Sequence, residues 1–106
     1  MQSVVISERT RSVLEALNPG QTLDQNVERL AEQELLRRLA RYQLADYTFR
    51  RKYDMSLAEF EAAGVVQKRG YSFEVENDHQ DWDLAVDGIY TVKQQLAQLR
   101  GTPVDA

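Results

Sequence analysis

Apolar residues recur every three or four positions along most of the chain, which is the spacing of one face of an α-helix. The longest such stretch begins after Thr22, a good N-cap residue, and continues to Tyr53. At 1.5 Å per residue such a helix is about 45 Å long, which is more than a domain of 106 residues usually contains. The pattern therefore predicts a helix that packs against another chain or bends before Phe49.

Three shorter helices are predicted around the long one. Residues 8–17 carry apolar side chains at helical spacing, and the Asn-Pro-Gly sequence at 18–20 ends that helix. The sequence "SLAE" at 56–59 has the form of a capping box and predicts a short helix that stops at Gly64. A last amphipathic helix is predicted to begin near Asn77 or Asp78.

Two segments have the pattern of β-structure. The sequence "SVVIS" at residues 3–7 contains three consecutive β-branched residues and predicts a strand. Because one strand alone cannot satisfy its backbone groups, it needs a second strand from this chain or from another copy. The sequence "VVQKRGYSFEV" at 65–75 predicts a hairpin that turns at residues 68–70. The predicted fold class is therefore mainly α with a β component (α+β), divided into residues 1–53 and 54–106.

Composition and charge narrow the class of protein. With 42% hydrophobic and 28% charged residues, the chain is predicted to be soluble and folded. No apolar run approaches the roughly 18 residues of a membrane span, and the N-terminus lacks the apolar core of a signal peptide, so a cytoplasmic location is expected. Residues 1–52 carry a net charge of +2 and residues 53–106 a net charge of −6, from nine and four Lys/Arg against seven and ten Asp/Glu. This asymmetry is typical of two regions with different partners, or of two ordinary solvated surfaces.

The sequence offers little support for an enzyme. There is no cysteine, and His79 has no nucleophile motif around it. Five scattered glycines form no phosphate-binding loop, so no cofactor is predicted. Asp78, Asp81 and Asp83 lie close to His79, but their spacing matches no calcium loop. A solvated acidic helix start is the stronger interpretation, and we predict neither a metal site nor catalysis.

The sequence "LLRRLARYQLADYTFRRKYD" at 35–54 mixes arginines with aromatic residues and raises the question of nucleic-acid binding. The alternative is that the aromatic residues belong to the apolar stripe and the arginines to the solvated face. A chain with a net charge of −4 also lacks the uniform basic surface of a non-specific nucleic-acid binder.

The N-terminal sequence "VVISERTRSVLEALNPGQTLDQNVERLAEQEL" resembles a ribbon-helix-helix domain, in which the strands of two copies pair and lie in the DNA major groove. The resemblance implies a homodimer and operator binding. It assigns DNA contacts to Gln2, Ser3, Val5, Gly20, Gln21 and Thr22. It assigns dimer contacts to Val4, Ile6, Val13, Leu17, Val27 and Leu30. Ser3 and Val5 would face outward from the strand, where the family usually carries better base-reading residues.

The sequence "YTFRRKYDMSLAEFE" at 47–61 resembles a family of small prokaryotic antitoxins. The matching residues are Phe49, Lys52, Tyr53, Met55, Ser56 and Phe60, whereas Asp54 replaces the usual Gly and Leu57 the usual Phe. The resemblance implies a protein that binds and neutralises a cognate toxin encoded nearby and that regulates its own operon by binding DNA. The alternative is an oligomerisation or adaptor module that binds no DNA.

The acidic and aromatic segment at 72–88 is the predicted toxin-binding region. It contains six carboxylates and no Lys or Arg, and the resemblance implies that these carboxylates face a basic toxin. The residues assigned to this role are Tyr71, Phe73, Glu74, Glu76, Asp81 and Trp82. For Trp82, packing in the core of its own domain is an equally good interpretation.

Overall fold

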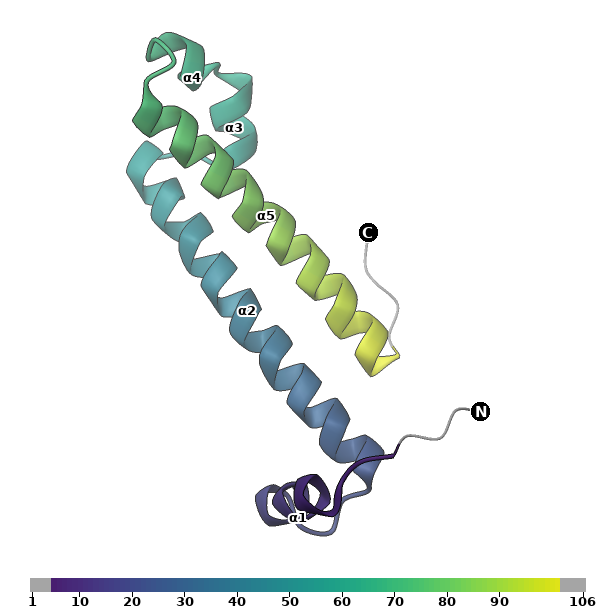
Figure 1. The fold of residues 1–106 in the computed structure, drawn as a ribbon. Helices are drawn as coiled ribbons and strands as arrows, with labels where there is room; N and C mark the ends of the chain where they lie inside the picture. Colours follow the sequence, from purple (N-terminus) through teal and green to yellow (C-terminus); the bar gives the residue numbers. More distant parts are fainter. Residues whose placement is uncertain (1–4, 102–106) are drawn as a thin grey trace. The chain divides into compact units, whose positions relative to one another are not determined.

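The computed structural model describes residues 5–101, and this part of the chain contains five helices (Figure 1). Their bounds are α1 (Glu8–Leu17), α2 (Leu23–Tyr53), α3 (Leu57–Ala62), α4 (Val65–Lys68) and α5 (Phe73–Arg100). The chain divides into two compact units, Met1–Glu34 and Leu35–Ala106. The division lies within α2, whereas the sequence pattern predicts it after residue 53. None of the helices in the described part of the chain is both long and apolar enough to cross a membrane.

The predicted α+β class is wrong, because residues 5–101 form helices and connecting turns without a strand. Val5, Ile6 and Ser7 precede α1 as irregular chain, since a strand needs a partner that the described part of this chain does not offer. Val4 lies outside the described residues. The predicted hairpin at 65–75 is also wrong, because this segment forms α4 and the first residues of α5.

Capping interactions explain why the hairpin does not form. Gly64 is the N-cap of α4 and has a left-handed backbone conformation. Gly70 follows the end of α4 and also has a positive φ angle. The Ser72 side chain accepts a hydrogen bond from the backbone N–H of Val75, so α5 begins at Phe73 and not near Asn77. The local β-propensity of the valines is thus overridden by helix caps on both sides.

The N-terminal unit is a pair of helices with a small core. The Ser7 side chain caps α1 by accepting a hydrogen bond from the backbone N–H of Thr10. Thr22 and Gln25 exchange backbone-to-side-chain hydrogen bonds of 2.9 and 3.1 Å at the start of α2. Among residues 5–34, Leu14 is the only buried apolar residue.

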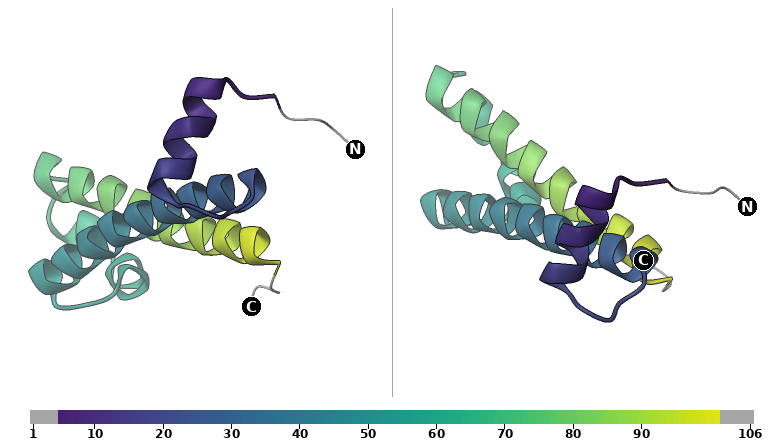
Figure 2. Two further views of the ribbon diagram at one scale, coloured as in Figure 1. Left: turned by 90° about the horizontal axis from the view of Figure 1, so that it is seen from below. Right: turned by 60° about the horizontal axis from the view of Figure 1, so that its bottom comes forward.

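In the second unit, α5 runs back along the C-terminal part of α2 (Figure 1). Figure 2 shows this pair from two other sides, with α3 and α4 at the end where α2 finishes and α5 begins. The inward positions on both helices alternate between spacings of three and four, as in a coiled coil. On α2 they are Leu35, Leu39, Tyr42, Asp46, Phe49 and Tyr53. On α5 they are Val75, Asp78, Trp82, Ala85, Ile89, Val92, Leu96 and Leu99, all buried or partly buried.

Aromatic rings form the core of the second unit. Trp82 is 0% exposed and Phe60 1% exposed, and their ring centroids lie 5.3 Å apart in an edge-on arrangement. The Trp82 ring also stacks on Phe49 at 5.7 Å and on Tyr53 at 5.9 Å. Such pairs add to the free energy of burial and require defined ring orientations. They therefore hold α2, α3 and α5 together at one point.

Gly88 marks a close approach between α2 and α5. A Cβ atom placed on Gly88 would lie 2.6 Å from Cε2 of the Tyr42 ring. Real Cβ atoms are not found at that distance from other heavy atoms, so the ring packs there only because residue 88 has no side chain.

We expect Gly88→Ala to lower the free energy of unfolding by about 1–3 kcal/mol, because the new methyl group displaces the Tyr42 ring. Urea unfolding followed by the fluorescence of Trp82 would measure the change. Gln80→Ala on the exposed side of the same helix is the control and should stay within about 0.5 kcal/mol of wild type. Equal stability of Gly88→Ala and wild type would contradict the packing of Tyr42 on α5.

Candidate partner-binding surface

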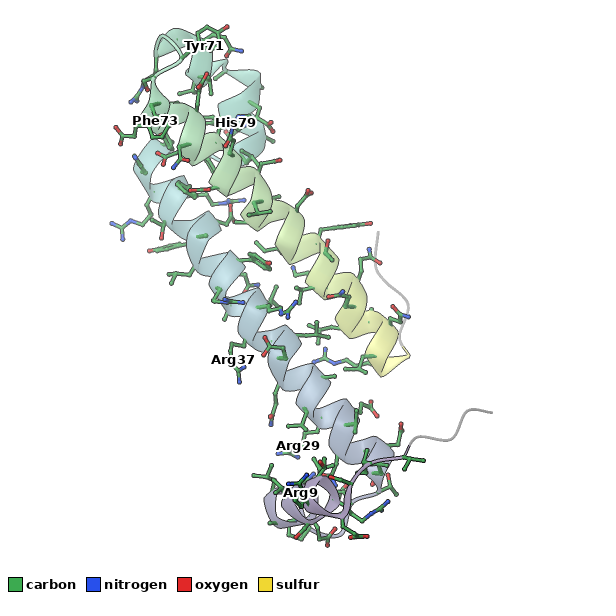
Figure 3. All side chains as sticks on the ribbon, in the orientation of Figure 1. Arg9, Arg29, Arg37, Tyr71, Phe73 and His79 are labelled. Carbon is green, nitrogen blue, oxygen red and sulfur yellow. The ribbon has the colours of Figure 1, made fainter. Side chains whose placement is uncertain are left out.

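The turn between α4 and α5 presents two aromatic side chains to solvent. Gly70 and Tyr71 both have left-handed backbone conformations, with φ angles of 67° and 56°. For Tyr71 this conformation costs about 1 kcal/mol or more. A hydrogen bond of 2.9 Å from the Tyr71 N–H to the Val66 carbonyl holds the turn. As a result Tyr71 is 59% exposed and Phe73 85% exposed, at the α4 end of the unit (Figure 3).

Two carboxylates follow in the first turn of α5. Glu74 and Glu76 are both exposed there, where the helix dipole favours negative charge. Glu74 is partly neutralised, because its Oε1 atom accepts a 2.7 Å hydrogen bond from the Nζ atom of Lys52. Asp81, the third predicted carboxylate, is also exposed. The structure therefore places Tyr71, Phe73 and the three carboxylates on the surface.

Asp78 is the centre of a polar network between α2 and α5. Its Oδ2 atom accepts hydrogen bonds of 2.6 Å from both the Tyr53 hydroxyl and the Lys52 Nζ atom. Burial opposes ionisation of Asp78, but these two donors outweigh it and lower its pKa. Burial, helped by the hydrogen bond to Asp78, raises the pKa of Tyr53 to about 12. Hydrogen bonds to Asp78 and Glu74 raise the pKa of Lys52.

Trp82 belongs to the core and not to the surface. It is 0% exposed, and its indole Nε1–H donates a 2.8 Å hydrogen bond to Oδ1 of Asp46 on α2. The assignment of Trp82 as a partner anchor therefore disagrees with the structure, because a fully buried ring has no surface to offer. Its alternative interpretation, packing within its own domain, agrees with the structure.

The side of α5 opposite its inward positions forms a mixed acidic and apolar surface. We call this surface the α5 outer face; it consists of Phe73, Glu76, Asp83, Leu84, Asp87 and Tyr90. Leu84 is 67% exposed and Tyr90 66% exposed, although both are large apolar residues. Residues 70–92 contain no Lys or Arg, so the nearest basic residues in the sequence lie outside this segment.

Four residues of the α5 outer face were missing from the predicted site: Asp83, Leu84, Asp87 and Tyr90. The sequence contains a signal for them, because they lie opposite the three-and-four spacing of the buried positions. Finding it requires a helix that starts at Phe73. With a start near Asn77, Phe73 and Glu76 fall outside the helix and the continuous face is not visible.

The residues predicted to contact DNA are differently placed. Gln2 and Ser3 lie outside the described residues, and Val5 is 91% exposed in irregular chain. At the start of α2, the Gly20 N–H donates to the Glu15 carboxylate at 3.2 Å. The Thr22 N–H is bound by the Gln25 side chain. These two amides are thus occupied by side chains of the same chain, the first of them by a carboxylate.

The residues predicted to form a dimer remain uncovered. Val13 is 58%, Leu17 67%, Val27 49% and Leu30 46% exposed. Three of the predicted dimer residues, Val13, Leu17 and Leu30, line an open groove of about 470 Å³ together with Leu14. Val4 lies outside the described residues, and Ile6 is half-buried before α1. An apolar groove of this kind remains in contact with water unless another surface covers it.

His79 packs beside α3 and does not face the other acidic residues considered for metal binding. Its Nε2 atom lies 3.0 Å from Oε2 of Glu61, and its ring lies 5.6 Å from that of Phe60. His79, Glu61 and Phe60 line a pocket of about 280 Å³. The other lining residues are Gly64, Val65, Val66 and Gln67. Within residues 5–101, no three acidic, His or Cys side chains gather in a way that could hold a metal ion.

The network around Asp78 predicts how stability depends on pH. The pKa of Asp78 is lower in the folded protein than its ordinary value of 3.8, so its contribution is present above that pH and lost as the pH falls further. The pKa of Tyr53 rises from 10.0 to about 12, so its contribution is present below pH 10.0 and lost towards pH 12. We expect Asp78→Asn to lower the free energy of unfolding at pH 7 by about 1.5–3 kcal/mol, and this deficit to shrink in acid.

Urea unfolding at a series of pH values would measure both effects. Tyr53→Phe should reduce the decline in stability between pH 10 and 12, and the raised pKa of Lys52 accounts for the part that remains. Tyr90→Phe on the exposed face of α5 should leave the decline unchanged. A deficit of Asp78→Asn that is the same at pH 7 and at pH 2.5 would show that the charge of Asp78 makes no contribution.

A scan against protein-family models, a search of curated proteins and a search of solved structures each found no match for this chain.

Proposed function

We propose that this protein is an antitoxin-like binding protein, which captures a basic partner protein on the α5 outer face and the α4–α5 turn. The partner is the cognate toxin encoded beside it, and capture blocks the toxin's own basic surface. The observation that carries the proposal is the α5 outer face, where exposed apolar side chains alternate with carboxylates over about five helical turns.

The two kinds of side chain on this face have different roles in binding. Carboxylates that stand without nearby cations attract a basic protein at long range and raise the rate of encounter. Exposed rings and leucines supply the apolar contact that holds the complex after encounter. Phe73 is the best placed anchor, because it is 85% exposed and the capped turn before it fixes its direction.

The antitoxin-like motif supports the proposal through its structural role. Phe49 stacks on Trp82, Lys52 and Tyr53 bind Asp78, and Phe60 lies in the core. Ser56 accepts the capping hydrogen bond of α3 from the Glu59 N–H. The motif residues therefore position α5 without lying on its outer face. Recurrence of such a motif in proteins that bind different toxins is expected if the motif supports the helix and the face of the helix selects the partner.

We propose that a second copy of the chain packs on the exposed apolar residues of the N-terminal unit. The N-terminal unit, which consists of α1 and the first part of α2, contains one buried leucine and therefore buries too little apolar surface to be stable alone. The exposed residues Val13, Leu17, Val27 and Leu30 would supply the missing core in a homodimer.

Co-expression with the product of the adjacent gene tests partner capture. We expect a complex that survives purification at 150 mM NaCl, and we expect Phe73→Ala and the double variant Asp83→Lys/Asp87→Lys each to weaken it at least tenfold. Both changes lie on the exposed face, so folding should be unaffected, which circular dichroism would verify. Glu28→Lys, an exposed reversal of charge in the N-terminal unit, is the matched control and should bind as wild type does.

Failure of the wild-type protein to bind an adjacent basic gene product would refute the antitoxin proposal. It would favour the alternative of an oligomerisation module. A complex that tolerates both α5 variants would place the partner on another surface.

Sedimentation equilibrium at 500 mM NaCl tests the homodimer. We expect twice the 12.2 kDa mass of one chain, because apolar contacts persist at high salt. Leu17→Asp should shift the equilibrium to monomer, whereas Ala16→Asp, an exposed neighbour that does not line the groove, should not. A wild-type monomer at 100 µM would contradict the proposed homodimer.

A further inference from the structure

The outward side of α2 in the second unit is basic and apolar. We call it the α2 outer face; it consists of Arg37, Ala40, Arg41, Leu44, Tyr47 and Arg51, opposite the inward positions. Leu44 is 65% exposed and Tyr47 56% exposed. Between residues 35 and 53 the sequence contains a single acidic residue, Asp46, and this residue points inward to Trp82.

The α2 outer face and the α5 outer face carry the same kinds of exposed apolar residue but opposite charges. Each presents one strongly exposed leucine and one strongly exposed tyrosine, Leu44 and Tyr47 on α2 and Leu84 and Tyr90 on α5. Arginines flank the first pair, whereas Asp83 and Asp87 flank the second. The basic α2 outer face of one molecule is therefore complementary to the acidic α5 outer face, which the same molecule also carries.

We propose that the α5 outer face of one copy docks on the α2 outer face of a second copy. The arginines and carboxylates attract the two copies, and the leucines and tyrosines are removed from water in the contact. The inference rests on the proposed function only in that the same α5 face also binds the basic partner. Self-association and partner capture then exclude each other, because both use the α5 outer face. In protein without a bound partner, the α5 outer face of one copy is covered by another copy.

A second copy fits the α2 outer face better than a nucleic acid does. The chain carries a net charge of −4 and lacks the uniform basic surface of a non-specific nucleic-acid binder. Arg51 is also engaged with Tyr47, whose hydroxyl accepts a 3.3 Å hydrogen bond from its Nη1 atom. Tyr47 and Leu44 supply apolar area that a phosphate backbone would not use.

A charge-swap experiment on the full chain tests the proposal. Sedimentation velocity of nuclease-treated wild-type protein should show a larger species at 20 mM NaCl than at 500 mM NaCl, because salt screens the charged contact but not the apolar dimer contact. Asp83→Lys/Asp87→Lys and Arg41→Glu/Arg51→Glu should each lose the larger species. An equimolar mixture of the two variants should regain it, because the reversed faces are complementary to each other.

The control is Asp24→Lys/Glu28→Lys, which changes the net charge equally in the N-terminal unit and should keep the larger species. Variants that remain separate when mixed, or a wild-type species of the same size at both salt concentrations, would overturn the proposal. A larger species that disappears on nuclease treatment would also overturn it and would assign the α2 outer face to nucleic acid.

The Arg41→Glu/Arg51→Glu variant separates this proposal from the proposed function, because its α5 outer face is intact. Retained capture of the adjacent gene product together with absent self-association in the wild type would refute only the self-docking. Normal self-association without capture of that product would refute only the antitoxin role.

Discussion

The structure depends on two carboxylates that lie between α2 and α5 and are each bound from the opposite helix. Asp46 on α2 accepts the indole N–H of Trp82, and Asp78 on α5 accepts the hydroxyl of Tyr53. A shift of one helix along the other would leave both carboxylates without these partners in a partly buried position, at a cost of about 1–3 kcal/mol each. The pair of bonds therefore sets the register of the helices and decides which side of α5 faces the solvent.

This register separates residues that support the fold from residues that can bind. Phe49, Lys52, Tyr53 and Phe60 contact α5 from the inside, and the carboxylates of the α5 outer face contact none of them. Changes on the outer face should therefore leave the core unaffected, whereas changes among the inner residues alter the face indirectly. A binding protein with this division can change its partner while its supporting motif stays the same.

Much of the helical structure could be predicted from the sequence, because caps and apolar spacing are local signals. Thr22, the capping box at 56–59 and the end of α2 at Tyr53 are placed as the pattern indicates. The strand and the hairpin failed because β-branched residues are only a weak local preference, which caps and core contacts override. The accessibility of the aromatic residues around the start of α5 was predicted in part: the exposure of Phe73 follows from its neighbours, but the burial of Trp82 depends on Asp46, 36 residues away.

The opposite charges on α2 and α5 remain separate for a geometric reason. Two helices that pack through an apolar layer place their outward side chains about two helix diameters apart, roughly 20 Å, which exceeds the Debye length of about 8 Å at physiological salt. Lys52 bridges the helices only because it lies beside the layer, next to Glu74 and Asp78. The outward charges therefore cannot neutralise one another within the chain. Their attraction is available to a second molecule, whether it is another copy or a basic partner.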